Sequence, residues 1–189
     1  MENYYLDYFE RLNETLSKIK IDEFEKLEEI IFKAYKDNNT IFVIGNGGSA
    51  NAATHWACDF SKGTKVEGKK PLKCISLTDN IALLTAISND ISYEDVFVEQ
   101  LKVFFSPGDI LIGISASGNS ENIVKALQYC KDNGGVATAI VGFTGGKCRE
   151  IANHTVYIPN NEYGIVEDIH IIIDHMISQK IKKRIEDET

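Results

Sequence analysis

Two short segments of this sequence combine residues that can bind an anion. Gly45-Asn46-Gly47-Gly48-Ser49-Ala50 follows an apolar run and precedes a helical stretch. Glycines let the backbone turn tightly and approach a ligand, and a helix N-terminus attracts anions. Ser115-Ala116-Ser117-Gly118-Asn119-Ser120 occupies the same kind of position and supplies three hydroxyl groups. Hydroxyls and helix-start amides form a neutral cradle for phosphate, so the two segments predict a site for a small phosphorylated ligand.

The first segment also satisfies the G-x-G-x-x-G/A pattern of dinucleotide-binding folds. Such a fold places an acidic residue at the end of the second strand, about twenty residues further on. Glu67 has that distance, but it lies in the polar stretch 65–70, before the next strand. A glycine turn that only reverses the chain, and serines that only cap a helix, are the purely structural alternatives.

Carboxylates and imidazoles recur at helical spacing in two further segments. His55 and Asp59 are four residues apart and therefore share one face of a helix. On the last helix, His175 follows Glu167 and Asp168. At 3.6 residues per turn, Glu167 and His175 point about 80° apart and Asp168 aligns better, so spacing alone leaves both acids open. A carboxylate and a histidine form a natural acid/base pair, and two of each also suit a divalent metal.

Alternating helices and strands must position these residues. Two amphipathic helices are expected first, with apolar stripes over 5–19 and 24–34. Strands are then predicted at 41–44, 72–77, 110–114, 137–141 and 155–158, and helices at 49–60, 80–87, 93–103, 119–131, 148–152 and 165–186. This alternation predicts a doubly wound, three-layer α/β/α fold with a mainly parallel sheet. We expect one domain over 1–189, with a helical extension at 1–38 and an α/β core at 39–189.

The composition argues against several classes of protein. The 189 residues include 20 Lys and Arg against 28 Asp and Glu, a net charge of -8, with no basic stripe for nucleic acid. The N-terminus lacks the features of a signal peptide, and no apolar stretch approaches the length of a membrane span. The four cysteines form no C-x-x-C pair, which favours buried, reduced thiols. We therefore expect a cytoplasmic protein that binds neither nucleic acid nor membrane.

Four segments together resemble the sugar isomerase (SIS) domain. They are 42–60, 85–90, 113–123 and 167–175, and they include Thr85-Ala86-Ile87-Ser88-Asn89-Asp90 beside the two loops above. Within that family the sequence is most similar to the phosphoheptose isomerases, over essentially the whole chain. The resemblance implies a five-stranded parallel sheet, a homotetramer and a sugar-phosphate substrate. It places Ser115, Ser117 and Ser120 around the phosphate, and the other candidate substrate-binding residues are Asn46, Gly47, Gly48, Ser49, Asp59, Asn89, Asp90, Ala116 and Glu167.

The acid–base residues follow from the same resemblance. The family has histidine and then glutamate four residues later, and on the last helix glutamine and then histidine eight residues later. These positions match His55, Asp59, Glu167 and His175. The resemblance implies that Asp59 and His175 are catalytic and that all four coordinate zinc or another divalent metal. Asp59 stands where the family has glutamate, and its shorter side chain shifts the carboxylate by about one bond length. Glu167 stands where the family has glutamine, and it adds a negative charge.

The activity implied by the resemblance is the conversion of D-sedoheptulose 7-phosphate to D-glycero-D-manno-heptose 7-phosphate through an enediol. Such a reaction supplies heptose for bacterial capsule or lipopolysaccharide. Two other functions stay open, a non-catalytic tetrameric adaptor that binds a replication initiator and a phosphosugar-responsive regulatory module. Asp59 retains a carboxylate, which favours the enzyme. Such regulators usually carry a DNA-binding domain beside this one, and we expect none within these 189 residues.

Overall fold

The structure, a computed structural model, describes residues 3–188. Its elements in chain order are α1 Tyr4–Lys18, α2 Ile21–Asp37, β1 Thr40–Gly45, α3 Gly48–Cys58, the π-helical turn η1 Asp59–Gly63, β2 Lys73–Ser76, α4 Ile81–Asp90, the 3-10 turn η2 Tyr93–Asp95, α5 Val98–Phe104, β3 Ile110–Ser115, α6 Glu121–Asp132, β4 Val136–Val141, α7 Gly146–Ile151, β5 His154–Tyr157 and α8 Tyr163–Glu186. The strands form one parallel sheet in the order β2-β1-β3-β4-β5. Each predicted strand is present.

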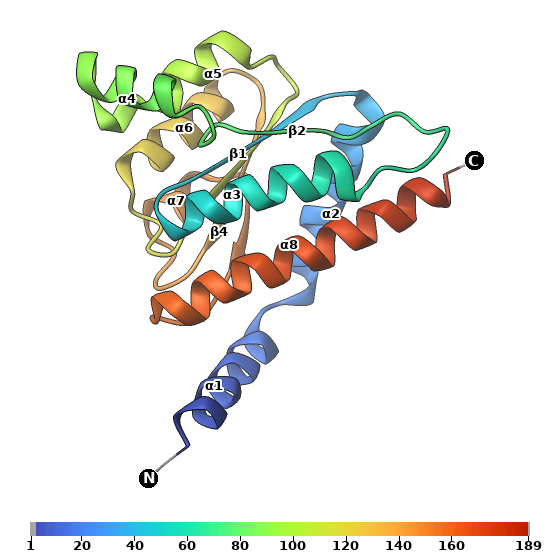
Figure 1. Ribbon diagram of the computed structural model, residues 1–189, viewed down its shortest axis with the longest axis vertical. Coiled ribbons are helices and arrows are strands. Elements are labelled where there is room, and N and C mark those ends of the chain that lie inside the picture. The colour runs from blue at the N-terminus through green and yellow to red at the C-terminus, as the bar shows by residue number, and fades with distance from the viewer. Residues whose placement is uncertain (1–2, 189) are drawn as a thin grey trace.

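Helices cover both faces of the sheet (Figure 1). Side chains of α2, α3 and α8 form one hydrophobic core with the sheet, and side chains of α4, α5, α6 and α7 form a second core on the opposite face. Because successive strand residues point to opposite faces, Ile41 and Val43 enter the first core, whereas Phe42 and Ile44 enter the second. Burial on both faces explains why the strands read as continuous apolar runs. The predicted three-layer α/β/α fold is confirmed.

The helices α3 and α8 lie side by side and run in the same direction (Figure 1). Trp56 of α3 is fully buried, and its Nε1–H donates a hydrogen bond of 3.2 Å to the backbone carbonyl of His170 in α8. The Trp56 and Phe60 rings pack edge to face with centroids 5.2 Å apart. These contacts determine which residues of α3 face α8.

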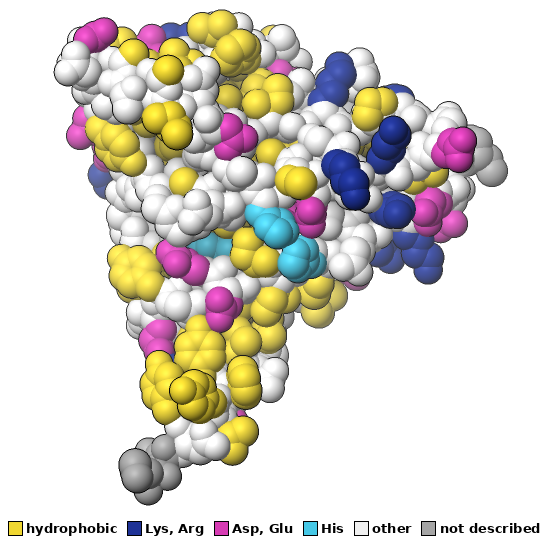
Figure 2. All heavy atoms as spheres, in the orientation of Figure 1, with side chains coloured by type: hydrophobic (Ala, Val, Ile, Leu, Met, Phe, Trp, Pro, Cys, Tyr) yellow, Lys and Arg dark blue, Asp and Glu magenta, His cyan; other side chains and the backbone are white. Residues whose placement is uncertain are grey.

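The N-terminal helix α1 projects from the body of the molecule (Figure 1). It contacts the start of α8, where the Tyr8 hydroxyl donates a hydrogen bond of 2.7 Å to Asp168 and Arg11 pairs with Glu162. The bond to Asp168 raises the pKa of Tyr8 to about 12. More than half of each of four large apolar side chains is exposed, namely Tyr4, Tyr5, Leu6 and Phe9. Of the predicted apolar stripe, this chain alone leaves Tyr5 and Phe9 uncovered, whereas Tyr8, Leu12 and Leu16 pack against the core. Figure 2 shows hydrophobic side chains along that projection.

Two local expectations differ from the structure. The helix predicted over 49–60 changes to η1 at Asp59, where the Thr64 N–H bonds to the Asp59 carbonyl five residues earlier. Such π turns occur mostly as single turns within or beside α-helices, frequently at functional sites. The expected buried thiols hold for three cysteines, but Cys58 is exposed because it lies on the outer side of α3. Among the helices described for residues 3–188, none is both long and apolar enough to cross a membrane.

A buried histidine should make the stability of this fold depend on pH. His170 is fully buried, neither ring nitrogen has a partner within residues 3–188, and burial lowers its pKa to about 3. The unfolded chain takes up a proton near pH 6.5 that the folded chain resists, so this stability is present above pH 6.5 and is lost as the pH falls toward 3. In urea unfolding, His170→Leu should remove roughly 2 kcal/mol of the loss between pH 7 and pH 5. An identical pH dependence in the variant and the wild type would contradict the assignment.

Candidate active site

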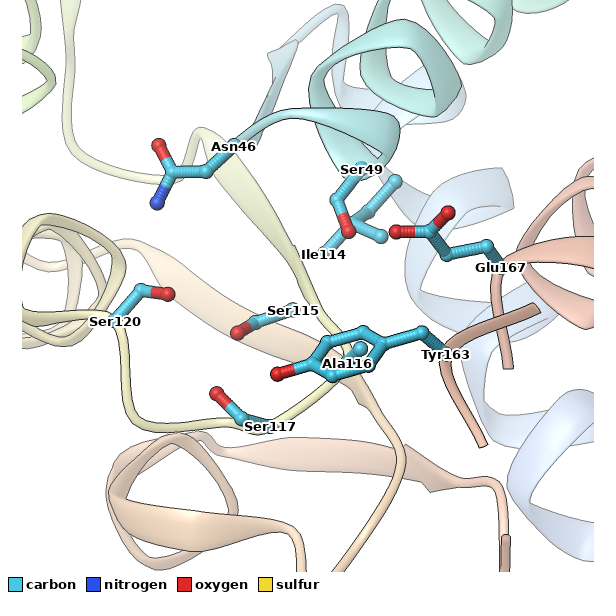
Figure 3. A pocket seen from close by; sticks show the side chains of 9 residues that line it. All are labelled: Asn46, Ser49, Ile114, Ser115, Ala116, Ser117, Ser120, Tyr163 and Glu167. Carbon is cyan, nitrogen blue, oxygen red and sulfur yellow. The ribbon is translucent and has the colours of Figure 1, made fainter. Parts of the chain in front are cut away.

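A pocket lies where β1 and β3 end and where α3, α6 and α8 begin (Figure 3). Its lining residues are Asn46, Ser49, Ile114, Ser115, Ala116, Ser117, Ser120, Tyr163 and Glu167. The carboxyl ends of parallel strands meet at one edge of a sheet, so the loops that follow β1 and β3 come together there. The two segments that the sequence analysis singled out therefore contribute to a single pocket.

Glycines make the close approaches around this pocket possible. A Cβ added at Gly48 would lie 2.5 Å from the carboxylate of Glu167, so a larger residue would displace that side chain. Gly118 has a φ of +67°, and a Cβ there would lie 1.9 Å from the carbonyl oxygen of Gly145. The first glycine admits an acid from α8 to the loop after β1, and the second allows the serine loop to turn.

The serine loop presents neutral hydrogen-bond donors. The Ser115 oxygen accepts a bond from the Gly118 N–H at 3.1 Å, and the Ser117 oxygen accepts one from the Asn119 N–H at 3.3 Å. Accepting these bonds leaves each hydroxyl hydrogen able to donate to an anion. Figure 3 shows these two hydroxyls and that of Ser120 facing one space. No Lys or Arg is among the residues that line the pocket, so hydroxyl and amide groups would have to hold a phosphate.

A polar network that sequence reasoning missed orients Asn46. The Asn46 and Asn122 amides exchange two hydrogen bonds of 2.8 and 2.9 Å. The Tyr93 hydroxyl also donates to Asn46 Oδ1, at 2.8 Å. Asn122 is buried although it lies on the first turn of α6, directly after the serine loop. Because Asn122 is only two residues beyond Ser120, its place in the sequence could have indicated that it lies near the site. Tyr93 and the lining residue Tyr163 fall outside both loops, so no such signal was available for them.

Two predicted substrate residues lie away from this pocket. Asn89 and Asp90 are exposed at the end of α4, where the Asn89 amide donates to Asp90 at 2.7 Å. Neither lines the pocket, although Tyr93 reaches Asn46 from the turn that follows α4. The position of these two residues at the end of one helix keeps them together. Their contact with a substrate stays a prediction.

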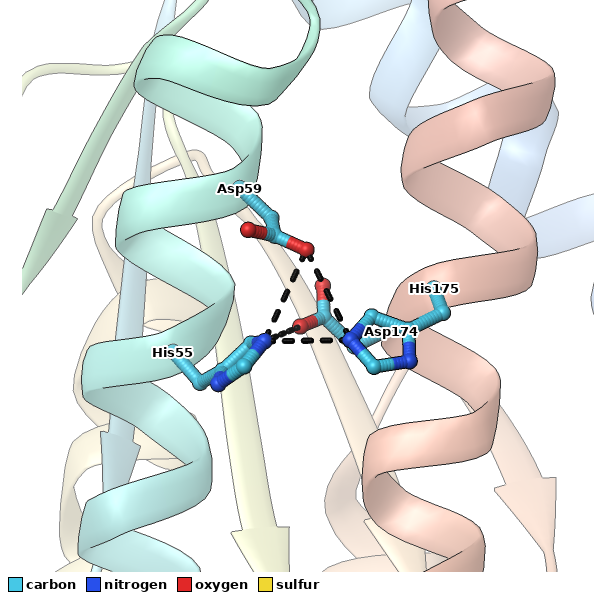
Figure 4. Close-up of side chains that lie close together, drawn as sticks. All are labelled: His55, Asp59, Asp174 and His175. Atoms are coloured by element: carbon cyan, nitrogen blue, oxygen red, sulfur yellow. Dashed lines mark hydrogen bonds and ion pairs between the residues drawn. The ribbon is translucent and has the colours of Figure 1, made fainter.

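A cluster of acid–base side chains lies further along α3 and α8 (Figure 4). His55 Nε2 lies 3.1 Å from His175 Nε2, and Asp59 Oδ2 lies 3.6 Å from the former and 3.8 Å from the latter. Asp174 Oδ2 lies 3.8 Å from His55 Nε2. One potential ligand atom from each of these four residues lies within 4.8 Å of the others, so the cluster could hold a metal ion.

This cluster differs from the predicted ligand set by one residue. Three predicted ligands meet, but Glu167 lies outside the group and lines the pocket instead. Glu167 precedes His175 by eight residues, about 12 Å along a helix, so the two lie at different heights on α8. Asp174, which sequence reasoning missed, takes the fourth place. The other open acid, Asp168, bonds to Tyr8 and therefore faces α1.

Burial sets the electrostatics of the cluster. Asp174 is fully buried, and desolvation together with the negative charge of Asp59 raises the pKa of its carboxyl to about 8. The side chains of His55 and His175 are 45% and 47% exposed. Figure 2 shows histidine side chains at the surface of this face. A ligand can therefore reach both imidazoles from solvent while Asp174 approaches them from the core.

Comparisons with known proteins identify the family of this chain and agree with its fold. The SIS domain family matches residues 4–145. The probable phosphoheptose isomerase of Thermoplasma volcanium is 38% identical over 175 residues, which cover 93% of this chain and 89% of the relative. The structure of the phosphoheptose isomerase of Neisseria gonorrhoeae aligns with a TM-score of 0.88 and 26% identity, covering 95% of this chain and 96% of the other. The chain belongs to the SIS domain family, and within that family these relatives are phosphoheptose isomerases.

The geometry of the serine loop predicts the effect of Ser117→Ala. The substitution removes a hydroxyl donor to a charged acceptor, so affinity for a sugar phosphate should fall about 10- to 100-fold. The midpoint of thermal unfolding should change little. Isothermal titration with a sugar phosphate measures the affinity. Ser106→Ala is the matched control, because Ser106 is exposed before β3, whereas Ser117 follows that strand. Equal affinities of Ser117→Ala and the control would exclude Ser117 from the phosphate site.

Proposed function

We propose that this protein isomerises D-sedoheptulose 7-phosphate to D-glycero-D-manno-heptose 7-phosphate. One observation carries the proposal: a serine-lined pocket and an acid–base cluster lie along the same pair of side-by-side helices, α3 and α8. The names of the relatives support the same reaction. The phosphoheptose isomerase of Aquifex aeolicus, for example, is 37% identical over 156 residues, which cover 82% of this chain and 81% of that protein.

The spacing between the two parts suits the length of the substrate. From Ser49 to His55 the helix advances about 9 Å, and from Glu167 to His175 about 12 Å. An extended seven-carbon sugar phosphate measures about 10 Å, since each C–C bond of about 1.5 Å advances the chain by slightly less. A phosphate bound by the serines would therefore place C1 and C2 beside the cluster.

Asp59 and His175 are suited to the two proton transfers of this reaction. The conversion moves one proton between C1 and C2 and redistributes another between the neighbouring oxygens. Asp59, which is 30% exposed, would act as the base at the carbons, and His175, whose Nε2 lies 3.8 Å from Asp59 Oδ2, would act beside it at the neighbouring oxygens. Ser115, Ser117 and Ser120 would hold the phosphate, and that remote binding energy would orient the reacting end. The retained carboxylate beside two histidines favours this enzyme over a non-catalytic adaptor.

The donor atoms of the cluster fit zinc or another divalent metal. Two imidazoles with carboxylate oxygens form a common zinc ligand set. His55, Asp59 and His175 would contribute to holding it, and a bound cation would polarise the sugar oxygens and so ease removal of the carbon proton. Glu167, given as a ligand by the resemblance, would contact the sugar from its place in the pocket.

We also infer a homotetramer, because α1 leaves Tyr5 and Phe9 exposed and a second copy could cover them. Assembly could also bring Asn89 and Asp90 to the active site of a neighbouring subunit. The expected setting is cytoplasmic, in the supply of heptose for capsule or lipopolysaccharide.

Incubation with D-sedoheptulose 7-phosphate and detection of an aldoheptose phosphate test the proposed reaction. The wild type should form the product, and the assay should be run with and without a chelator. Asp59→Asn should lower turnover at least about 100-fold, because the amide cannot take the carbon proton. The matched control is Asp132→Asn, at the end of α6, which should retain activity.

Two outcomes of this assay would count against the proposal. If Asp59→Asn turns over at the wild-type rate, the assigned chemistry is wrong. If the wild type forms no product with any divalent metal, the adaptor function becomes the better explanation.

The exposed Tyr5 and Phe9 side chains of α1 predict the oligomeric state. Sedimentation of the wild type should show a tetramer, whereas Tyr5→Asp combined with Phe9→Asp should shift it to smaller species, since two charges cannot be buried without partners. Unchanged circular dichroism would show that the variant remains folded. A stable wild-type monomer at micromolar concentration would contradict the inferred assembly.

A further inference from the structure

The most deeply buried member of the cluster, Asp174, has a carboxyl group without a hydrogen-bond partner among the described residues. Asp174 is fully buried, and neither of its side-chain oxygens has a hydrogen-bond partner within residues 3–188. Figure 4 shows it on α8 directed toward His55, Asp59 and His175. A buried carboxyl group without a hydrogen-bond partner is unfavourable, and ionising it there is more so unless a cation or a metal lies beside it.

The surroundings of Asp174 offer no fixed positive charge. Within the described residues, the only basic group within 4.0 Å is the His55 imidazole, at 3.8 Å. His170 lies one turn earlier on α8 but makes no ion pair with Asp174, and burial keeps its ring neutral. The neighbouring Asp59 adds negative charge. A divalent cation among these side chains would balance the two carboxylates.

The distances match a small coordination shell. In a tetrahedral site with metal–ligand bonds of 2.0–2.1 Å, neighbouring ligand atoms are about 3.3 Å apart. Four ligand-atom distances in the cluster lie close to that value, at 3.1, 3.6, 3.8 and 3.8 Å. Small side-chain movements would bring the four atoms to one ion. Glu167 lies outside the group that meets this criterion.

We propose that Asp174 is a direct ligand of a divalent cation held with His55 and His175, in the place that the family resemblance gives to Glu167. This inference specifies one ligand of the metal site described under the proposed function. It depends on that proposed function only for the presence of a metal. Asp174 supplies its carboxylate from the core, on the side away from solvent. Glu167 is then left in the pocket, where its carboxylate faces Gly48 and the start of α3.

Metal binding, measured without turnover, tests this assignment. Metal-free full-length protein is titrated with Zn²⁺ against a chromophoric chelator, and the absorption of bound Co²⁺ reports the coordination geometry. Asp174→Asn should lower Zn²⁺ affinity at least about 10-fold, because even the loss of an outer-shell partner has that effect, and it should alter the Co²⁺ spectrum. Glu167→Gln is the matched control on the same helix and should leave both readouts close to wild type.

Three results would overturn the proposal. They are a wild type that binds no Zn²⁺, an Asp174→Asn variant with wild-type affinity and spectrum, and a Glu167→Gln variant that loses both. None of these readouts uses the sugar substrate. Failure of the isomerase assay would therefore leave the metal result standing, and failure of metal binding would leave a metal-independent isomerisation standing.

A second variant guards against a folding defect. Asp174→Leu replaces an unpartnered buried carboxylate with an apolar group of similar size, so the metal-free variant should unfold at a higher temperature than the metal-free wild type. Zn²⁺ should raise the unfolding temperature of the wild type, since it binds the folded state, and should raise that of Asp174→Leu by clearly less at the same Zn²⁺ concentration. A full Zn²⁺-dependent shift in Asp174→Leu would also exclude Asp174 as a ligand.

Discussion

Trp56 holds α3 and α8 in one register, and the chemistry of the site depends on that register. Its indole is buried between the helices and bonded to the His170 carbonyl, so α3 can neither slide nor rotate along α8 without losing both packing and a buried hydrogen bond. One residue of slippage would move a side chain 1.5 Å along the axis and about 100° around it. The imidazoles of His55 and His175, whose Nε2 atoms are 3.1 Å apart, would then no longer meet.

The parallel sheet supplies the second constraint, because it brings the starts of α3, α6 and α8 to one edge. Helix starts and hydroxyls at that edge can bind an anion although no Lys or Arg is among the described residues that line the pocket. Two of these helices, α3 and α8, then lead away from the anion site toward the acid–base cluster. A phosphorylated sugar lying along them would have its phosphate and its reacting carbons recognised by different turns of the same helices.

Two buried polar side chains on α8 interrupt the apolar pattern of the core, and one of them, Asp174, belongs to the acid–base cluster. His170 lies in apolar surroundings as a neutral ring, whereas Asp174 lies between the core and the exposed imidazoles. Apolar residues at both positions would fit the Ile165, Ile169, Ile173 and Ile177 side of the helix better. A departure such as Asp174 is expected where a protein binds or reacts, since stability there is exchanged for chemistry, whereas no site contact among the described residues explains His170.

Local sequence patterns determined the strands, the order of the helices, the two glycine- and serine-containing loops and the shared face of His55 and Asp59. Each of these depends on spacing within one element or on the rule that parallel strands end at a common edge. Only the tertiary structure decided that Asp174 rather than Glu167 joins the histidines, that Asn122 and Tyr93 orient Asn46, and that Asn89 and Asp90 lie outside the pocket of their own chain. Spacing along a helix indicates which residues share a face. The height and rotation of one helix relative to another are set by side-chain packing between the two, as at Trp56.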